Sequence, residues 1–240
     1  MTRRPHNRPP ADTWARAQAR AKAPEPLCAR KGTVNPRYRG DGKDLFKRGF
    51  LGLVRTLGLV RGPRVLPMFT GEFQEVDVDA YLSLLGVAGP DLVTKERLFP
   101  KKQRKNYFAA ALSEAARSYD LFLDPDRGLI SELHRETEDR EVITYQEVCN
   151  LLPDDGSGRI LMIYDEAVNM ADRESATGEK MDALQASPYY LAAFTYFNSS
   201  PNHPNVVCVT NPAGKSRLSK LRSELNRCGI PLNRLVVCEA

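Results

Sequence analysis

Residues 120–128 read DLFLDPDRG, a short apolar run that ends in a turn of Asp, Pro and Gly. Apolar residues without alternation, stopped by such a turn, are typical of a strand that is buried on both faces of a sheet. Two more runs of this kind follow, RILMIY at residues 159–164 and NVVCVT at residues 205–210. Segments with helical spacing lie between these runs. The sequence therefore predicts an α/β protein, a Rossmann-like three-layer sandwich with a mostly parallel sheet.

The remaining elements follow from the same two patterns. Further strands are expected at residues 64–69, near Leu92 and at 235–238. Helices are expected at residues 46–57, 78–85, 106–117, 142–152, 181–197 (interrupted by Pro188) and around 218–225. In the first of these helices, Lys47 is placed on the polar side, opposite Phe46 and Phe50.

Positive charge is concentrated at the start of the chain. Residues 1–48 contain 13 Lys or Arg and four Asp or Glu, a balance of 13 − 4 = +9, whereas the whole chain carries +5. Residues 1–39 also hold six prolines and few apolar residues, so they are expected to form a basic, largely disordered arm before an α/β domain at residues 40–240. Such an arm is suited to binding the phosphates of nucleic acid. The alternative is a tail that serves only solubility or assembly.

Composition excludes two classes of protein. The mean hydropathy is −0.43, and no stretch approaches the roughly 20 apolar residues of a membrane helix. The first 20 residues hold five Arg and no apolar segment, which excludes a secretory signal. The five cysteines, an odd number, are interpreted as reduced thiols in a cytoplasmic protein.

Polar and acidic residues follow the predicted strands at the points where the strands end. In open α/β sheets, ligands bind beyond the carboxyl ends of the strands. The residues at these points, in chain order, are Thr70, Gly71, Glu72, Asp124, Asp126, Arg127, Asp165, Glu166 and Asn211. Carboxylates that gather in one place repel unless a cation, a proton or a polar ligand lies between them, so these positions predict a site. The alternative is that Asp124 and Asp126 only form a hydrogen-bonded turn.

Other motifs are incomplete. AGKS at residues 213–216 resembles the end of a phosphate-binding P-loop, but Val209 stands where that motif requires Gly. What remains is a helix start that offers free N–H groups and Lys215 to an anion. The three histidines lie far apart and the cysteines are scattered, which argues against a zinc site. A second basic run at residues 95–105 could support a nucleic-acid strand, although a solvated helix face is the simpler interpretation.

The turn at residues 120–128 also carries a resemblance to known proteins. The segment YDLFLDPDRGL at 119–129 combines with a GD…FK…FL pattern at 40–51 and a strand that ends PMFT at 67–70. Together they look like a group of uncharacterised bacterial and phage proteins with a D-P-D-x-G-[LI] turn. That group is distantly similar to class I S-adenosylmethionine-dependent methyltransferases, including those that act on ribosomal RNA and on DNA adenine. The resemblance covers most of the chain from about residue 35 onward.

This resemblance implies a methyltransferase-like domain that acts on or binds nucleic acid, with S-adenosylmethionine as cofactor. Asp124 would accept a hydrogen bond from the target amine. The candidate catalytic residues are Asp124, Asp126 and Lys47, and the candidate cofactor-binding residues are Thr70, Gly71 and Glu72.

Three features of the sequence depart from the methyltransferase pattern. The expected cofactor loop holds one glycine, Gly71, where close approach to the cofactor usually needs more. Asp126 and Arg127 stand where the family has a second proline and an aromatic residue, so a platform for a flipped base is missing. The last two strands of the family form a hairpin, whereas a helix is expected between the last two strands of this chain.

A second, local resemblance leads to a different chemistry. DPDRG at residues 124–128 is similar to the D-x-D-x-x-G signature of toprim domains, with the Gly one residue early. It implies a Mg²⁺-dependent nuclease or phosphoryl-transfer enzyme. The metal ligands would be Glu72, Asp124, Asp126 and Asp165. A third alternative is a catalytically degenerate domain that binds nucleic acid as the partner of another protein.

Overall fold

The structure is a computed structural model, and it describes most of the α/β domain predicted from the sequence. The described residues are 42–68, 75–94, 104–112, 118–125, 128–130, 142–152, 155–166, 173–186, 192–197 and 204–238. The predicted basic arm at 1–39 lies outside them. So do several predicted site residues, namely Thr70, Gly71, Glu72, Asp126 and Arg127.

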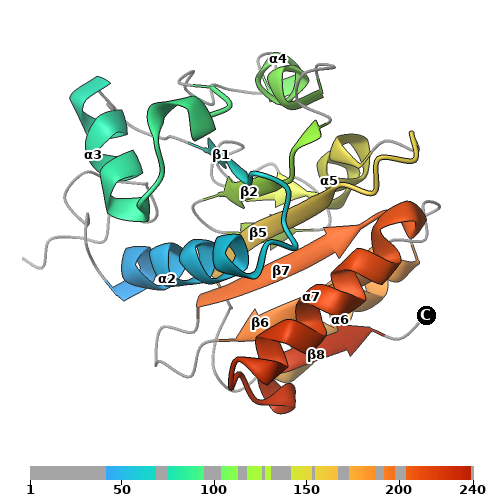
Figure 1. Cartoon of the computed structure of the whole chain (residues 1–240). Coiled ribbons are helices and arrows are strands. Elements are labelled where there is room, and N and C mark those ends of the chain that lie inside the picture. The colour runs from blue at the N-terminus through green and yellow to red at the C-terminus, as the bar shows by residue number, and fades with distance from the viewer. Residues whose placement is uncertain are drawn as a thin grey trace, which may run out of the picture. The chain divides into compact units, whose positions relative to one another are not determined.

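A six-stranded sheet forms the centre of this domain (Figure 1). In spatial order its strands are β1 (Arg64–Pro67), β2 (Leu121–Asp124), β5 (Ile160–Glu166), β7 (Pro204–Thr210), β6 (Ala192–Phe197) and β8 (Leu235–Cys238). The first three are parallel, whereas β7 is antiparallel to both neighbours and β8 is antiparallel to β6. Four of the six strands therefore run in one direction. The predicted α/β class with a mostly parallel sheet is confirmed, with antiparallel pairing added in its second half.

Helices cover both faces of the sheet, because the strands bury side chains on both sides. One face, called here the α2 face, is covered by α2 (Gly42–Leu57), α3 (Glu75–Leu85) and α7 (Lys215–Arg227). The other, the α6 face, is covered by α4 (Arg104–Ala109), α5 (Tyr145–Leu151) and α6 (Arg173–Gln185). Successive strand residues alternate between the faces. Phe122 and Met162 accordingly pack under the α2 face, while Leu123 and Ile163 pack under the α6 face.

The helix expected at residues 181–197 is wrong in its second half. Helix α6 ends at Gln185, and residues 192–197 (AAFTYF) form strand β6. Phe194 is buried on the α2 face and Ala193 on the α6 face, so the segment is apolar on both sides as a central strand requires. Its neighbours β7 and β8 both pair with it, and that pairing stabilises a strand where local helical spacing was ambiguous.

The helix expected at residues 142–152 begins later than predicted. Val142–Thr144 is a short strand, β4, that pairs in parallel with β3 (Gly128–Ile130) in a second, two-stranded sheet. Helix α5 starts after Thr144, whose hydroxyl accepts a hydrogen bond from the Glu147 amide at 3.2 Å while Glu147 accepts one from the Thr144 amide at 2.9 Å. This capping box fixes the start of the helix.

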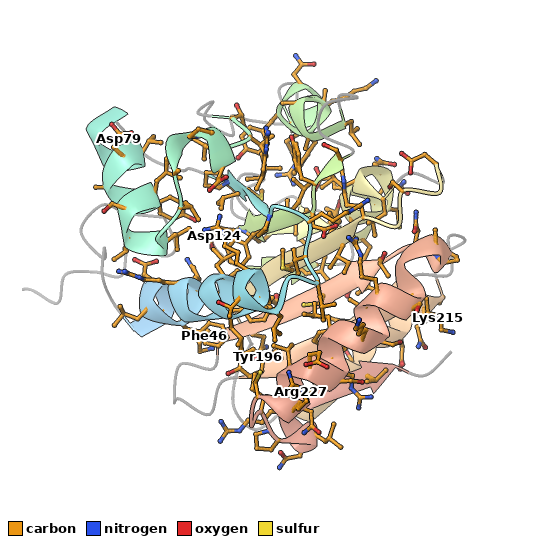
Figure 2. The ribbon with its side chains drawn as sticks, in the orientation of Figure 1. Phe46, Asp79, Asp124, Tyr196, Lys215 and Arg227 are labelled. Atoms are coloured by element: carbon orange, nitrogen blue, oxygen red, sulfur yellow. The ribbon has the colours of Figure 1, made fainter. Side chains whose placement is uncertain are left out.

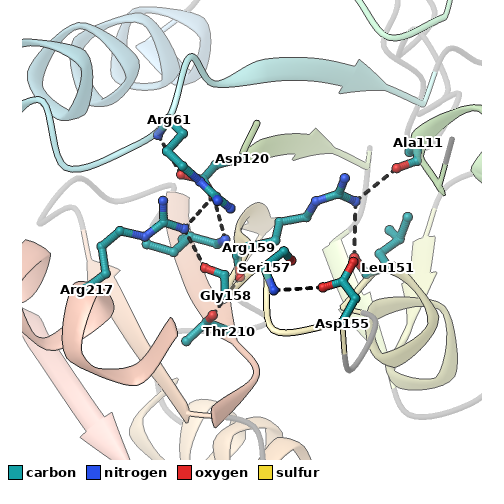
Figure 3. A network of polar contacts seen from close by, with 11 residues as sticks. Arg61, Ala111, Asp120, Leu151, Asp155, Ser157, Gly158, Arg159, Thr210 and Arg217 are labelled. Carbon is teal, nitrogen blue, oxygen red and sulfur yellow. Dashed lines mark hydrogen bonds and ion pairs between the residues drawn. The ribbon is translucent and has the colours of Figure 1, made fainter. Parts of the chain in front are cut away.

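The amino ends of β2 and β5 are joined by a buried carboxylate, Asp120 (Figure 3). It accepts hydrogen bonds from the backbone amides of Arg61 at 2.6 Å and Ile160 at 2.7 Å, and from the Arg217 guanidinium at 2.7 Å. Because Arg217 lies on α7, one carboxylate links two strands and a helix. The Arg159 side chain is buried nearby and donates to the Ala111 carbonyl at 2.9 Å. Burial lowers the pKa of Arg159.

Candidate functional site

The carboxyl ends of β1, β2 and β5 meet at one edge of the sheet, called here the carboxyl edge. Pro67 lies opposite Asp124, and Leu123 lies opposite Ile163. Asn211, expected at the same place, is not there. Strand β7 runs antiparallel to β5 and pairs Thr210 with Ile160, so Asn211 and the start of α7 at Lys215 lie at the opposite, amino edge.

Asp124 is the central acidic residue of the carboxyl edge on the α2 face, and Figure 2 shows it beside α2. Its side chain is buried. Lys47 Nζ lies 2.9 Å from both carboxylate oxygens and donates a hydrogen bond to Oδ2. The Tyr81 hydroxyl, from α3, also donates to Oδ2. Asp124 Oδ1 lies 2.9 Å from the Lys47 ammonium but accepts no hydrogen bond from the described part of the chain.

Lys47 does not lie on the polar side of α2, where it was predicted. It shares the buried stripe of that helix with Leu51 and Val54, and only 6% of the residue is exposed. Its ammonium group also approaches Asp44 Oδ1 at 3.4 Å and lies 4.2 Å from the centre of the Tyr164 ring. Burial by itself would lower the pKa of Lys47, but the charges of Asp124 and Asp44 outweigh it and the pKa is raised. Lys47 therefore remains a cation at neutral pH.

Tyr81 completes the contacts of Asp124. Burial, and after it the charge of Asp124, raises the pKa of Tyr81 well above its ordinary value. The phenol therefore stays protonated and acts as a hydrogen-bond donor. Three elements, α2, α3 and β2, thus place a cation and a phenol on the same oxygen of a single carboxylate.

Asp165, at the end of β5, has a separate set of partners. Lys180 Nζ, from α6, lies 2.8 Å from both of its oxygens, and the Leu129 amide donates to Oδ1 at 2.8 Å. The turn before Leu129 depends on Gly128, which has a φ of +97° and leaves room for Asp165, since an added Cβ would lie 2.0 Å from Oδ1. Burial raises the pKa of Asp165, although Lys180 and the Leu129 amide act in the opposite direction.

The two carboxylates do not share one crevice. Asp124 follows the alternation of Phe122 and points to the α2 face, whereas Asp165 follows Ile163 and points to the α6 face. Each is neutralised by its own lysine. No three His, Cys, Asp or Glu side chains of the described residues lie together as a metal site would require. Glu72 and Asp126, the other expected metal ligands, lie outside these residues.

A further polar residue, Asn205, escaped the sequence-based prediction. It opens strand β7, lies directly opposite Asp165 in the pairing of β5 and β7, and is buried. Neither its Oδ1 nor its Nδ2 has a hydrogen-bond partner within the described chain. On the same α6 face, the half-buried Tyr145 has its pKa raised to about 12 by burial and by the nearby charges of Asp165 and Glu179. For Asn205, the only signal in the sequence was that a polar residue stands at the start of an apolar strand.

Comparisons with the profiles of known families, with curated proteins and with solved structures find no match to this chain. Among the helices that the structure describes, none is long and apolar enough to span a bilayer.

Proposed function

We propose that this chain is a Rossmann-like, methyltransferase-like domain that binds S-adenosylmethionine at the carboxyl edge and acts on an amine of a nucleic acid. The observation that carries the proposal is Asp124 Oδ1, at the end of a central parallel strand. This oxygen is an ion-pair neighbour of Lys47 at 2.9 Å but accepts no hydrogen bond from the described residues. A buried acceptor without a hydrogen bond costs about 1–3 kcal/mol, and the charge of Lys47 offsets part of that cost at Oδ1. The N–H group of a substrate amine would supply that hydrogen bond.

The antiparallel hairpin of β6 and β7 supports the same proposal. A hairpin late in the sheet belongs to the methyltransferase pattern, where it joins the last two strands. In this chain α7 separates the last two strands, β7 and β8, as the sequence predicted. Strand β7 lies between β5 and β6 and runs against both. The hairpin of β6 and β7 therefore agrees with the family pattern, whereas the helix between the last two strands remains a departure from it.

The buried Lys47–Asp124 pair is also more useful for a function than for stability. Replacement of a buried ion pair by apolar residues of similar size is often neutral or stabilising, because both charges lose their hydration. A pair retained at the edge where α/β sheets bind ligands is therefore a candidate for a role in binding or chemistry.

In this proposal, each residue of the pair has a distinct task. S-adenosylmethionine supplies an activated methyl group, and the chain supplies alignment, which is the main requirement of methyl transfer. Asp124 Oδ1 accepts a hydrogen bond from the acceptor amine and orients its lone pair. Lys47 balances the carboxylate charge, and Tyr81 holds Oδ2, so that Oδ1 faces the substrate. Thr70, Gly71 and Glu72 remain the proposed cofactor-binding residues.

The Mg²⁺ alternative has less support from the described geometry. A shared ion would need Asp124 and Asp165 on one side of the sheet, and they point to opposite faces. Lys47 also occupies the position next to Asp124 that a cation would take. No observation on the described residues favours that alternative over methyl transfer.

Calorimetry of the full chain with S-adenosylmethionine tests the proposal. We expect saturable binding, and its absence in a folded protein at millimolar cofactor would overturn the proposal. Transfer of labelled methyl groups to mixed DNA and RNA is the second measurement. Asp124→Asn keeps the shape but loses the charge, and we expect transfer to fall about 100-fold, as when one polar contact to a reacting group is removed.

Asp165→Asn is the matched control, because it alters the other buried, lysine-paired carboxylate of the same edge. We expect this variant to keep cofactor binding and transfer, with circular dichroism to confirm the fold of both variants. Loss of a metal-dependent activity on Asp165→Asn, with no effect of Asp124→Asn, would contradict the proposal and favour the Mg²⁺ chemistry.

A further inference from the structure

Helix α7 carries a continuous basic face on the surface of the α2 side. The exposed residues of the helix are Lys215, Ser216, Ser219, Lys220, Ser223 and Arg227. At 100° per residue these six positions fall within an arc of about 140°. The buried residues Leu218, Leu221 and Leu225 lie on the opposite side and pack into the core. Figure 2 shows Lys215 and Arg227 at the two ends of the helix.

The charges of this face are only partly compensated. Of the five basic residues in α7, Arg217 is bound to Asp120 and Arg222 donates to the Leu235 carbonyl at 3.2 Å. Arg227 pairs with Glu224, the single acidic residue of the helix, at 2.7 Å. Lys215 and Lys220 have no ion-pair partner in the described part of the chain. Among the described residues, Arg217 and Arg222 therefore serve the fold, whereas Lys215 and Lys220 are exposed and form no ion pair.

The composition of the face selects the kind of partner. Lysine, arginine and serine side chains are common donors to nucleic-acid phosphates. Binding of single strands relies on stacking against aromatic side chains, and the exposed face of α7 has none. Insertion into a membrane surface needs large apolar residues beside the charges, and these are absent from it too. The helix has 13 residues and is about 20 Å long, so its basic residues are spaced widely enough to contact several phosphates of one duplex.

From these observations we infer that the basic face of α7 binds the phosphate backbone of duplex DNA without reading its sequence. The inference rests on the proposed function, because the basic face of α7 would bind the nucleic acid on which that function acts. It assigns the contact to a helix of the folded domain, in addition to the predicted arm at residues 1–39.

Fluorescence anisotropy of the full chain with a labelled 20-base-pair duplex, over a range of salt concentrations, tests the inference. Each phosphate contact contributes about −0.9 to the slope of log K against log salt. Lys215→Gln/Lys220→Gln should make the slope shallower by about 1.8 and weaken binding at least about tenfold near 0.1 M salt. The control Lys43→Gln/Arg48→Gln removes two charges from α2, outside both this helix and the basic run at 95–105, and we expect it to change the slope much less.

The other outcomes separate this inference from the proposed function. The assignment of α7 to duplex DNA would be overturned if the two double variants had equal effects. It would also be overturned if the chain bound duplex RNA, single strands or anionic vesicles more tightly than duplex DNA. S-adenosylmethionine binding, measured by calorimetry on the same Lys215→Gln/Lys220→Gln variant, should be unchanged. A wild-type chain that binds the cofactor but no duplex would overturn this inference alone, whereas a chain that binds duplex but no cofactor would overturn only the proposed function.

Discussion

Strand β2 has a buried aspartate at each end, and the two are satisfied in opposite ways. Asp120, just before the strand, accepts hydrogen bonds at both oxygens from backbone amides and arginines. Asp124, its last residue, receives both of its hydrogen bonds at Oδ2 and none from the described residues at Oδ1. The two carboxylates lie four residues apart in sequence and are equally buried. They differ in whether one oxygen lacks a hydrogen bond from the described residues.

The difference separates a structural carboxylate from a candidate functional one. A carboxylate whose acceptor positions are all used holds its neighbours in place and offers nothing to a ligand. A buried carboxylate oxygen that has a cation beside it but accepts no hydrogen bond can still take one from a ligand. The position in the fold agrees, because Asp120 lies at the amino edge and Asp124 at the carboxyl edge, where α/β sheets bind ligands.

Replacing Asp120 should have the largest effect on stability. Asp120→Asn puts an NH₂ group against one of the N–H donors and leaves Arg61 and Arg217 without their counter-charge. We expect a loss of about 3–5 kcal/mol in the free energy of unfolding, the cost of breaking a buried ion pair by removing one partner. Denaturation in urea measures it.

Asp124→Asn serves as the comparison for that measurement. With its NH₂ group in the place of Oδ1, the variant keeps both hydrogen bonds at the other oxygen and loses the contact of Lys47 with Oδ1, while Lys47 retains Asp44 at 3.4 Å. We expect a loss roughly half that of Asp120→Asn. Equal losses for the two variants would break the distinction between the two ends of β2.

Removing Lys47 should come next in size. Lys47→Met leaves Asp124 as an uncompensated buried charge, and we expect a loss of about 3 kcal/mol in the free energy of unfolding. The triple variant Lys47→Met/Tyr81→Phe/Asp124→Leu removes all three polar groups, and we expect it to recover most of that loss while methyl transfer stays abolished. A triple variant as unstable as the single one would show that the fold itself requires the pair.

The pH dependence of stability gives an independent check on Lys47. Its pKa is raised in the folded chain, so its contribution is fully present below the ordinary pKa of about 10.5 and is lost as the pH rises through the folded value. Wild-type stability should therefore fall more steeply above pH 10.5 than that of Lys47→Met, which keeps Tyr81, as measured by urea denaturation across that range. Parallel curves would contradict the raised pKa.

Most of the strands were predictable because they are runs of apolar and β-branched residues between turn signals. The exception, β6, shows the limit, since AAFTYF at residues 192–197 has no turn residues of its own after Pro188 and was merged with the helix before it. What makes it a strand is pairing with residues 204–210 and 235–238. This pairing joins segments that are separate in the sequence, so the pattern of residues 192–197 alone does not reveal it.

The site was predictable in position but not in arrangement. Asp124 and Asp165 do lie at the ends of adjacent strands, as expected. Which face each one points to depends on the register of β2 against β5, and a shift of one residue would reverse it. Lys47 was misplaced for a related reason, because a lysine in a helix is normally solvated and only the buried Asp124 makes its burial favourable.

The smallest expected effect concerns Asn205, the second buried polar group at the carboxyl edge without a described partner. Asn205→Val should raise the free energy of unfolding by about 1 kcal/mol. The change removes a buried amide that has no hydrogen-bond partner among the described residues, and valine favours strands. Val207→Thr, two residues on and on the same face, is the control and should lower stability by a similar amount, since it adds a hydroxyl to an apolar site. A loss of stability in Asn205→Val would mean that this amide is satisfied in solution, which would leave Asp124 as the one open acceptor among the described residues of that edge.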